Sequence, residues 1–193
     1  MAEKLAKGEL ARAAYRLAAG SRLPALILLT DDARLADPLS AARALPRGSL
    51  VIVRSRDAVR RRKLFFALKP IARLRRLMIL VADDPALARY ADGIHLPQVR
   101  APQAAHWRAL RPKWIVTVAA HAPSTRARHA DAVLLSPVFP TASHPGAISI
   151  GAARARMIAQ ASPIPIYALG GIDAANAKSL HGFIGIAAIS ALA

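Results

Sequence analysis

The sequence predicts an α/β protein that folds as a single TIM-type (β/α)8 barrel, with an extra N-terminal helix and a truncated or missing eighth helix. Three observations predict this fold. Eight short apolar runs alternate with segments of helical character. No Gly-x-Gly-x-x-Gly motif follows the first run, where a dinucleotide-binding sheet would need it. A glycine-rich turn comes instead after the seventh run.

The eight apolar runs are rich in Val, Ile or Leu and are too short for buried helices. Each is therefore predicted to be a strand covered on both faces, as in a parallel sheet. The predicted strands are Ala25–Thr30, Leu50–Arg54, Leu77–Ala82, Gly93–Leu96, Trp114–Ala119, Ala132–Ser136, Ile164–Leu169 and Ile184–Ile189. The predicted helices between them are Pro38–Leu45, Asp57–Lys69, Asp84–Tyr90, Pro102–Leu110, Pro123–His129, Ser149–Ala161 and Asp173–Leu180.

The 193 residues are predicted to form one domain, because no low-complexity linker divides them. Residues 1–20 are an additional helix, in which Leu10, Ala14 and Leu17 share a face and Gly20 supplies a stop. The chain ends three residues after Ser190. We therefore expect the N-terminal helix to cover part of the barrel that an eighth helix would otherwise cover.

The charge balance, with 28 Lys and Arg against 11 Asp and Glu, gives a formal net charge of +17 and suggests nucleic-acid binding. The densest basic run, Arg60–Lys63, lies in a segment where Val59, Phe65, Phe66 and Leu68 read as one apolar helix face. The cations then fall on the solvated side. Aromatic content is 5%, with no RNA-stacking motif. A basic solvated surface is therefore favoured over a nucleic-acid site, and a third alternative is that its field concentrates anionic small substrates near the protein.

The absence of cysteine excludes a disulfide scaffold, a thiolate zinc site, an iron–sulfur cluster and a cysteine nucleophile. It is consistent with a reducing cytosol, so a cytoplasmic location is expected. No apolar run reaches the roughly 18 residues that a membrane span needs. The first residues carry Glu3 and Glu9 and lack the apolar core of a secretory signal, so we expect no membrane partner.

Chemistry in a barrel sits at the carboxyl ends of the strands. Gly170 and Gly171 follow the seventh predicted strand, where they let backbone N–H groups approach a ligand, and Asp173 is placed to cap the next helix. The eighth strand ends at Ile189 and Ser190. Loops after strands seven and eight form the usual phosphate site of such barrels. The alternative, a plain tight turn, is disfavoured because both loops occur in the right order.

A long loop, Ser136–Gly146, follows the sixth predicted strand. Long loops in compact domains are usually functional or mobile. Thr141 and Ser143 offer hydroxyl groups suited to phosphate oxygens, and His144 is able to donate to an anion or transfer a proton. An exposed loop histidine without a role is an equal alternative for His144.

The order of motifs resembles the thiamine-phosphate synthase/TenI family over nearly the whole chain. The matching segments are Leu29-Thr30-Asp31, Val53-Arg54-Ser55-Arg56, Val81-Ala82-Asp83-Asp84, Ala91-Asp92-Gly93-Ile94-His95-Leu96-Pro97-Gln98, Ser136-Pro137-Val138-Phe139-Pro140-Thr141, Leu169-Gly170-Gly171-Ile172 and Ile189-Ser190-Ala191. The resemblance implies an enzyme that joins hydroxymethylpyrimidine pyrophosphate to a thiazole phosphate and releases pyrophosphate. In the implied mechanism, pyrophosphate leaves first and the thiazole nitrogen attacks the pyrimidine cation.

The resemblance also implies roles for individual residues. Arg54 and Arg56 would hold pyrophosphate, with His144 as a further catalytic candidate, and Asp83 would bind Mg²⁺. The thiazole phosphate would be held by Thr141, Ser143, Gly170, Gly171, Ile189 and Ser190. The implied partners are thus anionic small molecules. The oligomeric state is left open, so a homo-oligomer remains an alternative.

The departures from the family pattern fall mainly on the pyrophosphate side. Arg100 stands where the family has its second magnesium carboxylate, and Ala82 replaces an asparagine beside Asp83. An arginine cannot coordinate a metal, but it can neutralise a diphosphate directly. Arg100 is therefore a further substrate-binding candidate, and the need for Mg²⁺ is in question.

These departures leave three functions open. The first is thiamine-phosphate synthesis. The second is a metal-independent thiazole tautomerase of the TenI branch, although Pro137 stands where that branch has its histidine, so that His144, His95 and His121 are the available substitutes. The third is a non-catalytic barrel that binds a phosphate ligand.

Overall fold

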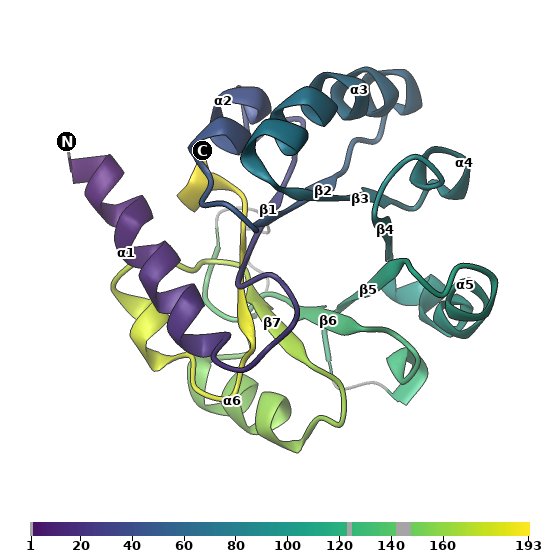
Figure 1. Cartoon of the computed structure of the whole chain (residues 1–193). Coiled ribbons are helices and arrows are strands. Elements are labelled where there is room, and N and C mark those ends of the chain that lie inside the picture. The colour runs from purple at the N-terminus through teal and green to yellow at the C-terminus, as the bar shows by residue number, and fades with distance from the viewer. Residues whose placement is uncertain (1, 123–124, 142–147) are drawn as a thin grey trace.

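The computed structural model describes residues 2–122, 125–141 and 148–193, with side chains from residue 5 onward. Eight parallel strands form a closed barrel in which each strand pairs with its neighbour in sequence and β8 pairs with β1 (Figure 1). The strands are β1 (Leu26–Leu29), β2 (Leu50–Val53), β3 (Met78–Ala82), β4 (Gly93–Leu96), β5 (Ile115–Ala120), β6 (Ala132–Leu135), β7 (Ile166–Leu169) and β8 (Gly185–Ala188). The predicted barrel and all eight predicted strands are confirmed.

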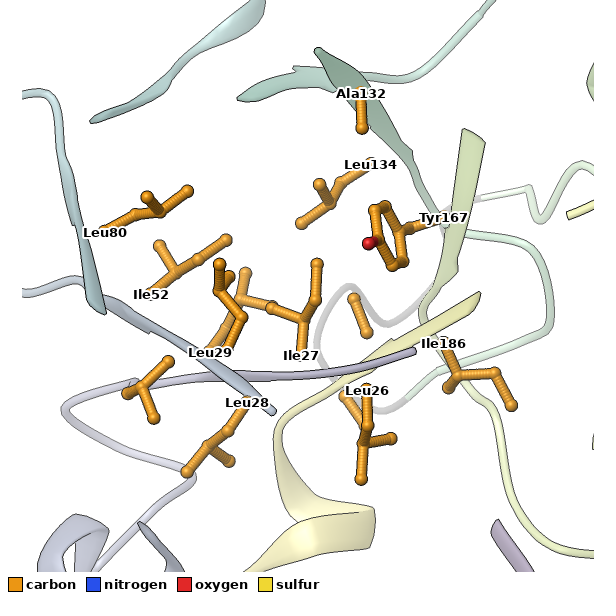
Figure 2. Packing of buried hydrophobic residues seen from close by; sticks show 14 of the residues in the cluster. Leu26, Ile27, Leu28, Leu29, Ile52, Leu80, Ala132, Leu134, Tyr167 and Ile186 are labelled. Carbon is orange, nitrogen blue, oxygen red and sulfur yellow. The ribbon is translucent and has the colours of Figure 1, made fainter. Parts of the chain in front are cut away.

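The pairing register sorts the strand residues into an inner and an outer face. Figure 2 shows Ile27, Leu29, Ile52, Leu80, Leu134 and Tyr167 pointing into the space that the strands enclose, whereas Leu26 and Leu28 point outward. The side-chain period of a strand is two, and residues in register share a face. The inner face of β1 therefore continues to Asp31, and that of β2 continues from Ile52 to Arg54. The sequence places charged residues on this face only where the strands end.

Helices cover the outside of the barrel in chain order (Figure 1). The α-helices between strands are α2 (Pro38–Ala44), α3 (Ala58–Arg75), α4 (Pro85–Ala88), α5 (Ala104–Leu110) and α6 (Ala152–Ala161), and the 3₁₀ turns are η1 (Gln98–Gln103), η2 (Thr125–Ala127), η3 (Asn176–Ser179) and η4 (Ser190–Leu192). Asp37, Asp57 and Asp84 each accept hydrogen bonds from N–H groups in the first turn of the helix that follows.

Two of the predicted helices are wrong, because the structure has short 3₁₀ turns there rather than α-helices. In the described part of Pro123–His129 only η2 forms, and Asp173–Leu180 contains only η3. In the second case the cause is local. Asp173 Oδ1 accepts from the N–H groups of Ala175 and Asn176 at 2.9 and 2.8 Å, and Asn176 Nδ2 donates to the Gly171 carbonyl at 2.8 Å. Such side-chain bonds hold the backbone in a turn and compete with an α-helix.

Helix α3 differs from its prediction in length and in its buried face. It continues through Pro70 to Arg75, because Ile71 and Ala72 bury the same face as Phe65 and Leu68. The predicted face is right for Phe65 and Leu68 but wrong for two other residues. Val59 is 62% exposed and Phe66 is 43% exposed.

The N-terminal helix α1 (Ala2–Leu17) packs against β1, β8 and η3. Leu10 and Ala14 are fully buried there, and Lys7 Nζ donates to the Ala193 carbonyl. Only η4 follows β8, so α1 occupies the position of the eighth helix, as expected (Figure 1). Among the described helices, none has the length and apolar character to cross a lipid bilayer.

Two polar groups inside the barrel are satisfied by hydrogen bonds. The Tyr167 hydroxyl, on a ring 1% exposed, donates to the Pro24 carbonyl at 2.5 Å and so ties β7 to the start of β1. His95 on β4 lies in register with Thr117 on β5, and its Nδ1 is 2.9 Å from the Thr117 hydroxyl. Burial, assisted by the charge of Arg54, lowers the His95 pKa from 6.5 to about 4. The imidazole is therefore neutral at pH 7.

Replacing Tyr167 by Phe is expected to lower the free energy of unfolding by roughly 1–3 kcal/mol, because the buried Pro24 carbonyl loses the hydrogen bond that it accepts from the Tyr167 hydroxyl. Urea unfolding followed by circular dichroism measures the loss. Tyr15→Phe is the matched control, since the Tyr15 hydroxyl also donates to a carbonyl, that of Arg47, but on a ring that is 48% exposed. Equal losses in the two variants would contradict the interpretation.

The pH dependence of stability tests His95. Because the folded state binds the His95 proton less tightly than the unfolded state, its contribution is complete above pH 6.5 and is lost as the pH falls toward 4. The shift corresponds to roughly 3 kcal/mol. His95→Asn is expected to remove this slope between pH 6.5 and 4 in urea unfolding, while His181→Asn at an exposed position keeps it.

Candidate active site at the carboxyl end of the barrel

The ends of β1 and β2 are locked together by a buried threonine. The Thr30 hydroxyl donates to the Arg54 carbonyl and accepts from the Arg54 N–H, both at 2.8 Å. Arg54 Nη2 in turn donates to Asp31 Oδ2 at 3.0 Å. Arg54, predicted to hold pyrophosphate, thus lies at the mouth of the barrel with a backbone that cannot shift freely.

Asp31 holds a second guanidinium as well. Its Oδ2 accepts from Arg34 Nη2 at 2.7 Å, and its Oδ1 accepts from the N–H groups of Ala33 and Arg34 at 3.2 and 3.1 Å. The hydrogen bond from the Arg34 side chain is the main reason why the pKa of Asp31 falls to about 2, against the opposing effect of burial. Asp31 is therefore ionised at any physiological pH and anchors both arginines.

A cavity of about 270 Å³ opens beside these residues, over the ends of β1 and β2. Its lining is Asp31, Asp32, Ala33, Arg34, Arg54, Ser55 and Arg56. Asp32 Oδ2 accepts from the Ser55 hydroxyl at 2.9 Å and from the Arg56 N–H at 3.2 Å. The Arg56 guanidinium is exposed and pairs with no carboxylate in the described chain, so it remains able to bind an anion.

A larger cavity, about 490 Å³, lies between the loop after β1 and the start of α3. Its charged lining consists of Asp31, Asp32, Asp37, Asp57, Arg60 and Lys63. Asp37 and Asp57 are the N-caps of α2 and α3. With more carboxylates than cations, this cavity suits a phosphate less well than the smaller one, which holds three arginines.

The end of β3 carries two carboxylates, and both pair with arginine. Asp83, predicted as a magnesium ligand, accepts from Arg100 Nη1 through Oδ1 at 2.8 Å. Asp84 Oδ2 accepts from Arg61 Nη2 at 3.0 Å, while its Oδ1 caps α4 through the Leu87 N–H. Burial raises the pKa of Asp84, but the Leu87 N–H and Arg61 together outweigh it, so that the net shift is downward. Arg100 and Asp83, two candidates from different loops, thus form an ion pair with each other.

Sequence analysis missed Arg34 and Arg61. Arg61 was expected on a solvated face, but its side chain is only 15% exposed and lies against Asp84. One signal was present, because Arg61 stands in the first turn of the helix that follows β2, on the side of the strand ends. Arg34 gave no comparable signal, since its role depends on the turn after β1.

The turn after β7 is built for close approach of the backbone. Gly170 and Gly171 have φ of 95° and 65°, in the left-handed region. A Cβ on Gly171 would lie 2.3 Å from the Pro140 carbonyl oxygen, so the loop after β6 rests directly on this turn. The Val138 and Phe139 N–H groups donate to the carbonyls of Leu169 and Gly170 at 3.0 and 3.1 Å.

Four backbone N–H groups at the ends of β7 and β8 donate to no acceptor within the described residues. They belong to Gly170, Gly171, Ile189 and Ser190. Leu169 lies in register with Ala187, so the two loops emerge side by side from neighbouring strands. Consecutive free N–H groups in a glycine turn form an anion-binding concavity. The predicted phosphate residues of these loops are therefore brought together by the barrel.

The loop after β6 is described only up to Thr141. Thr141 is partly buried and directly follows Pro140, whose carbonyl contacts the Gly171 turn. Ser143 and His144 lie outside the described residues. Asp173 caps no α-helix, because only η3 follows it.

Among the described residues, a histidine also lies at the mouth of the barrel. His121 follows β5, its N–H donates to Gln98 Oε1 at 3.0 Å, and its Nδ1 lies 2.7 Å from the Ser136 carbonyl oxygen. A carbonyl only accepts, so Nδ1 carries the hydrogen. In the neutral ring Nε2 is then an acceptor, and it bonds to no described residue.

Three comparisons agree with this architecture. The profile of the thiamine monophosphate synthase family matches residues 25–192. A putative thiamine-phosphate synthase 2 of Aquifex aeolicus is 34% identical over 182 residues, covering 87% of this chain and 97% of its own. A thiamine-phosphate synthase of Thioalkalivibrio sulfidiphilus is 30% identical, with 83% of this chain and 82% of its own covered.

A solved structure is similar over the same extent. The thiamine phosphate pyrophosphorylase of Pyrococcus furiosus superposes with a TM-score of 0.68 at 26% identity, covering 86% of this chain and 85% of its own. The match to residues 25–192 includes every strand of the barrel and both sides of its mouth. The chain therefore belongs to the thiamine monophosphate synthase family.

Proposed function

We propose that this chain is an enzyme of the thiamine-phosphate synthase type. It would couple hydroxymethylpyrimidine pyrophosphate to a thiazole phosphate and release pyrophosphate. The observation that carries the proposal is the presence of two anion-binding surfaces at one mouth, over four neighbouring strands. Backbone N–H groups that donate to no described residue follow β7 and β8, and an arginine-lined cavity follows β1 and β2. A reaction between two phosphorylated substrates needs two such surfaces side by side.

The phosphate of the thiazole would bind at the glycine turn. The N–H groups of Gly170, Gly171, Ile189 and Ser190 are available, and Thr141 follows the residue that contacts the turn. Backbone donors fixed in this way need little reorganisation when the anion arrives. Ser143 and His144 remain further candidates from the same loop.

The pyrophosphate would bind over β1 and β2. In the reaction, the bond between the pyrimidine methylene carbon and the pyrophosphate oxygen breaks, and pyrophosphate leaves with the electron pair. The thiazole nitrogen then forms a bond to that carbon. Arg54 and Arg56 would stabilise the charge that develops on the leaving group. Asp31 keeps the Arg54 guanidinium oriented for this role.

Magnesium, which the family pattern implies, does not fit the residues present. The four carboxylates at the mouth, those of Asp31, Asp32, Asp83 and Asp84, each pair with an arginine. Within the described residues no group of three metal-binding side chains occurs. Mg²⁺ is usually held by one or two protein carboxylates together with waters and substrate phosphates, and here each of these carboxylates already holds a guanidinium. The arginines, rather than a metal ion, are therefore the groups proposed to neutralise the leaving pyrophosphate.

A product assay tests the proposal. The protein is incubated with both substrates, with Mg²⁺ and separately with a chelator, and thiamine phosphate is measured by chromatography. Product is expected from the wild type, and Arg54→Gln is expected to lower kcat/KM by roughly tenfold or more because a charged contact to the leaving group is lost. Arg108→Gln is the control, since Arg108 pairs with Asp131 near the opposite end of the barrel. Absence of product from the folded wild type would overturn the synthase proposal.

The glycine turn is tested by Gly171→Ala. The new Cβ would meet the Pro140 carbonyl at 2.3 Å in a backbone with φ of 65°, so the turn must move. We expect the KM for thiazole phosphate to rise by roughly tenfold with a smaller change for the diphosphate substrate. Gly48→Ala is the matched control, because Gly48 has φ of 78° and a Cβ there meets nothing within 4 Å. Equal effects on both substrates would argue against a phosphate role for the turn.

A second function, metal-independent tautomerisation of a thiazole phosphate, is favoured by one observation. His121 presents at the mouth an Nε2 that bonds to no described residue, while its Nδ1 hydrogen is held by the Ser136 carbonyl. A histidine held in this way can accept a substrate proton. Turnover of a thiazole phosphate in the presence of a chelator, abolished in His121→Gln, would select this function. Binding of that ligand without turnover would indicate a non-catalytic barrel.

A further inference from the structure

We propose that this barrel binds the diphosphate group without a divalent cation, with Arg100 supplying the positive charge that a metal would otherwise supply. Asp83 then acts as a counterion that keeps Arg100 in place rather than as a metal ligand. The identity of the anion as a diphosphate rests on the proposed function; the exclusion of a cation from the Asp83 pair rests on the geometry alone.

The position of both groups is fixed by the backbone. Asp83 has φ of 52°, and its N–H donates to the His95 carbonyl at 2.9 Å, directly beyond β3. Arg100 lies in η1 after β4, where its N–H donates to the Pro97 carbonyl at 2.9 Å and the next residue, Ala101, is buried. Because β3 and β4 are neighbours, the carboxylate and the guanidinium meet at the rim at 2.8 Å.

A divalent cation is disfavoured at this pair for an electrostatic reason. The guanidinium already occupies Asp83 Oδ1, and a cation on the remaining oxygen would lie within a few ångströms of a fixed positive charge. Asp84 cannot supply a second ligand without releasing Arg61 and the cap of α4. Asp31 is committed to Arg34 and Arg54 in the same way.

The same pair is well suited to receive an anion. The side chains of Arg100 and Asp83 are 46% and 38% exposed, and exposed ion pairs contribute little to stability. Asp83 accepts from Nη1 of Arg100, and the other N–H groups of this half-exposed guanidinium can donate to a diphosphate oxygen while the pair persists. The Arg61–Asp84 pair differs, since its side chains are only 15% and 22% exposed and it supports α4. Arg100 is thus the cation of this rim that can receive an anion, and Arg61 is a structural one.

Titration calorimetry with inorganic pyrophosphate tests the role of Arg100. We expect the wild type to bind pyrophosphate in the presence of a chelator, and added Mg²⁺ not to tighten binding. Arg100→Gln is expected to weaken binding by about tenfold. Arg108→Gln removes the same charge from an exposed pair near the opposite end of the barrel, so its effect measures the general field of the protein alone. Equal weakening in both variants would overturn a direct contact.

Asp83→Asn separates a counterion from a metal ligand. Asparagine keeps the Oδ1 acceptor that holds Arg100 in place but removes the negative charge that repels the incoming phosphate, so the variant is expected to bind pyrophosphate as tightly as the wild type or more tightly. A metal ligand would give the opposite result, with binding weakened in the presence of Mg²⁺. Weaker binding of pyrophosphate by Asp83→Asn, or tighter binding by the wild type when Mg²⁺ is added, would overturn the proposal.

A gain-of-function variant provides an independent readout. Arg100→Asp places two carboxylates where one ion pair stood, so it is expected to bind Mn²⁺, measured by electron paramagnetic resonance, whereas the wild type and Arg100→Gln do not. Adding Asp83→Asn to Arg100→Asp should abolish this binding. Mn²⁺ bound by the wild type and lost in Asp83→Asn would overturn the proposal.

These measurements test the metal-free diphosphate site separately from the proposed synthase activity. Thiamine phosphate formed only with Mg²⁺, together with Mg²⁺-dependent pyrophosphate binding, would retain the synthase and overturn the metal-free site. Pyrophosphate bound in chelator through Arg100, with no product formed, would retain the site and overturn the synthase. Failure of the wild type to bind pyrophosphate under either condition would overturn the site directly.

Discussion

Closure of the barrel through the pairing of β8 with β1 is the constraint on which the rest of the molecule depends. It fixes the register of every neighbouring strand, and register decides which side chains point inward. Along β1 and β2, the apolar residues of the inner face are followed on that same face by Asp31 and Arg54. The closure also makes β7, β8, β1 and β2 consecutive around one mouth, although their loops are far apart in sequence.

The charges at the mouth are arranged as pairs rather than as a bare cluster of arginines. Each carboxylate at the ends of β1 and β3 holds at least one guanidinium, and three of them also accept backbone N–H groups. Such pairing keeps the arginines oriented and limits their mutual repulsion. In a chain with a net charge of +17, the surrounding field still favours an anionic ligand over a cation.

The two halves of the mouth use different chemistry. At β7 and β8 the donors are backbone N–H groups, which depend on two glycines and on the loop that rests upon them. At β3 and β4 the charges are carried by side chains, which a single substitution can reverse. Arg100 and Asp83 form an ion pair there. A substitution at Arg100 would therefore change the charge of this side of the mouth without altering the backbone donors at β7 and β8.

The sequence alone determined the barrel, the N-terminal helix and the strand ends that bear the site, because buried parallel strands require continuous apolar runs that leave a clear pattern. It also located Arg54, Arg56, Asp83 and the glycine turn. The local hydrogen bonds that replaced the predicted helix at Asp173 escaped it. Only the tertiary structure decided which charges meet, since the Arg100–Asp83 and Arg61–Asp84 pairs join residues 17 and 23 positions apart. Such contacts depend on strand register and side-chain direction, which no local sequence pattern encodes.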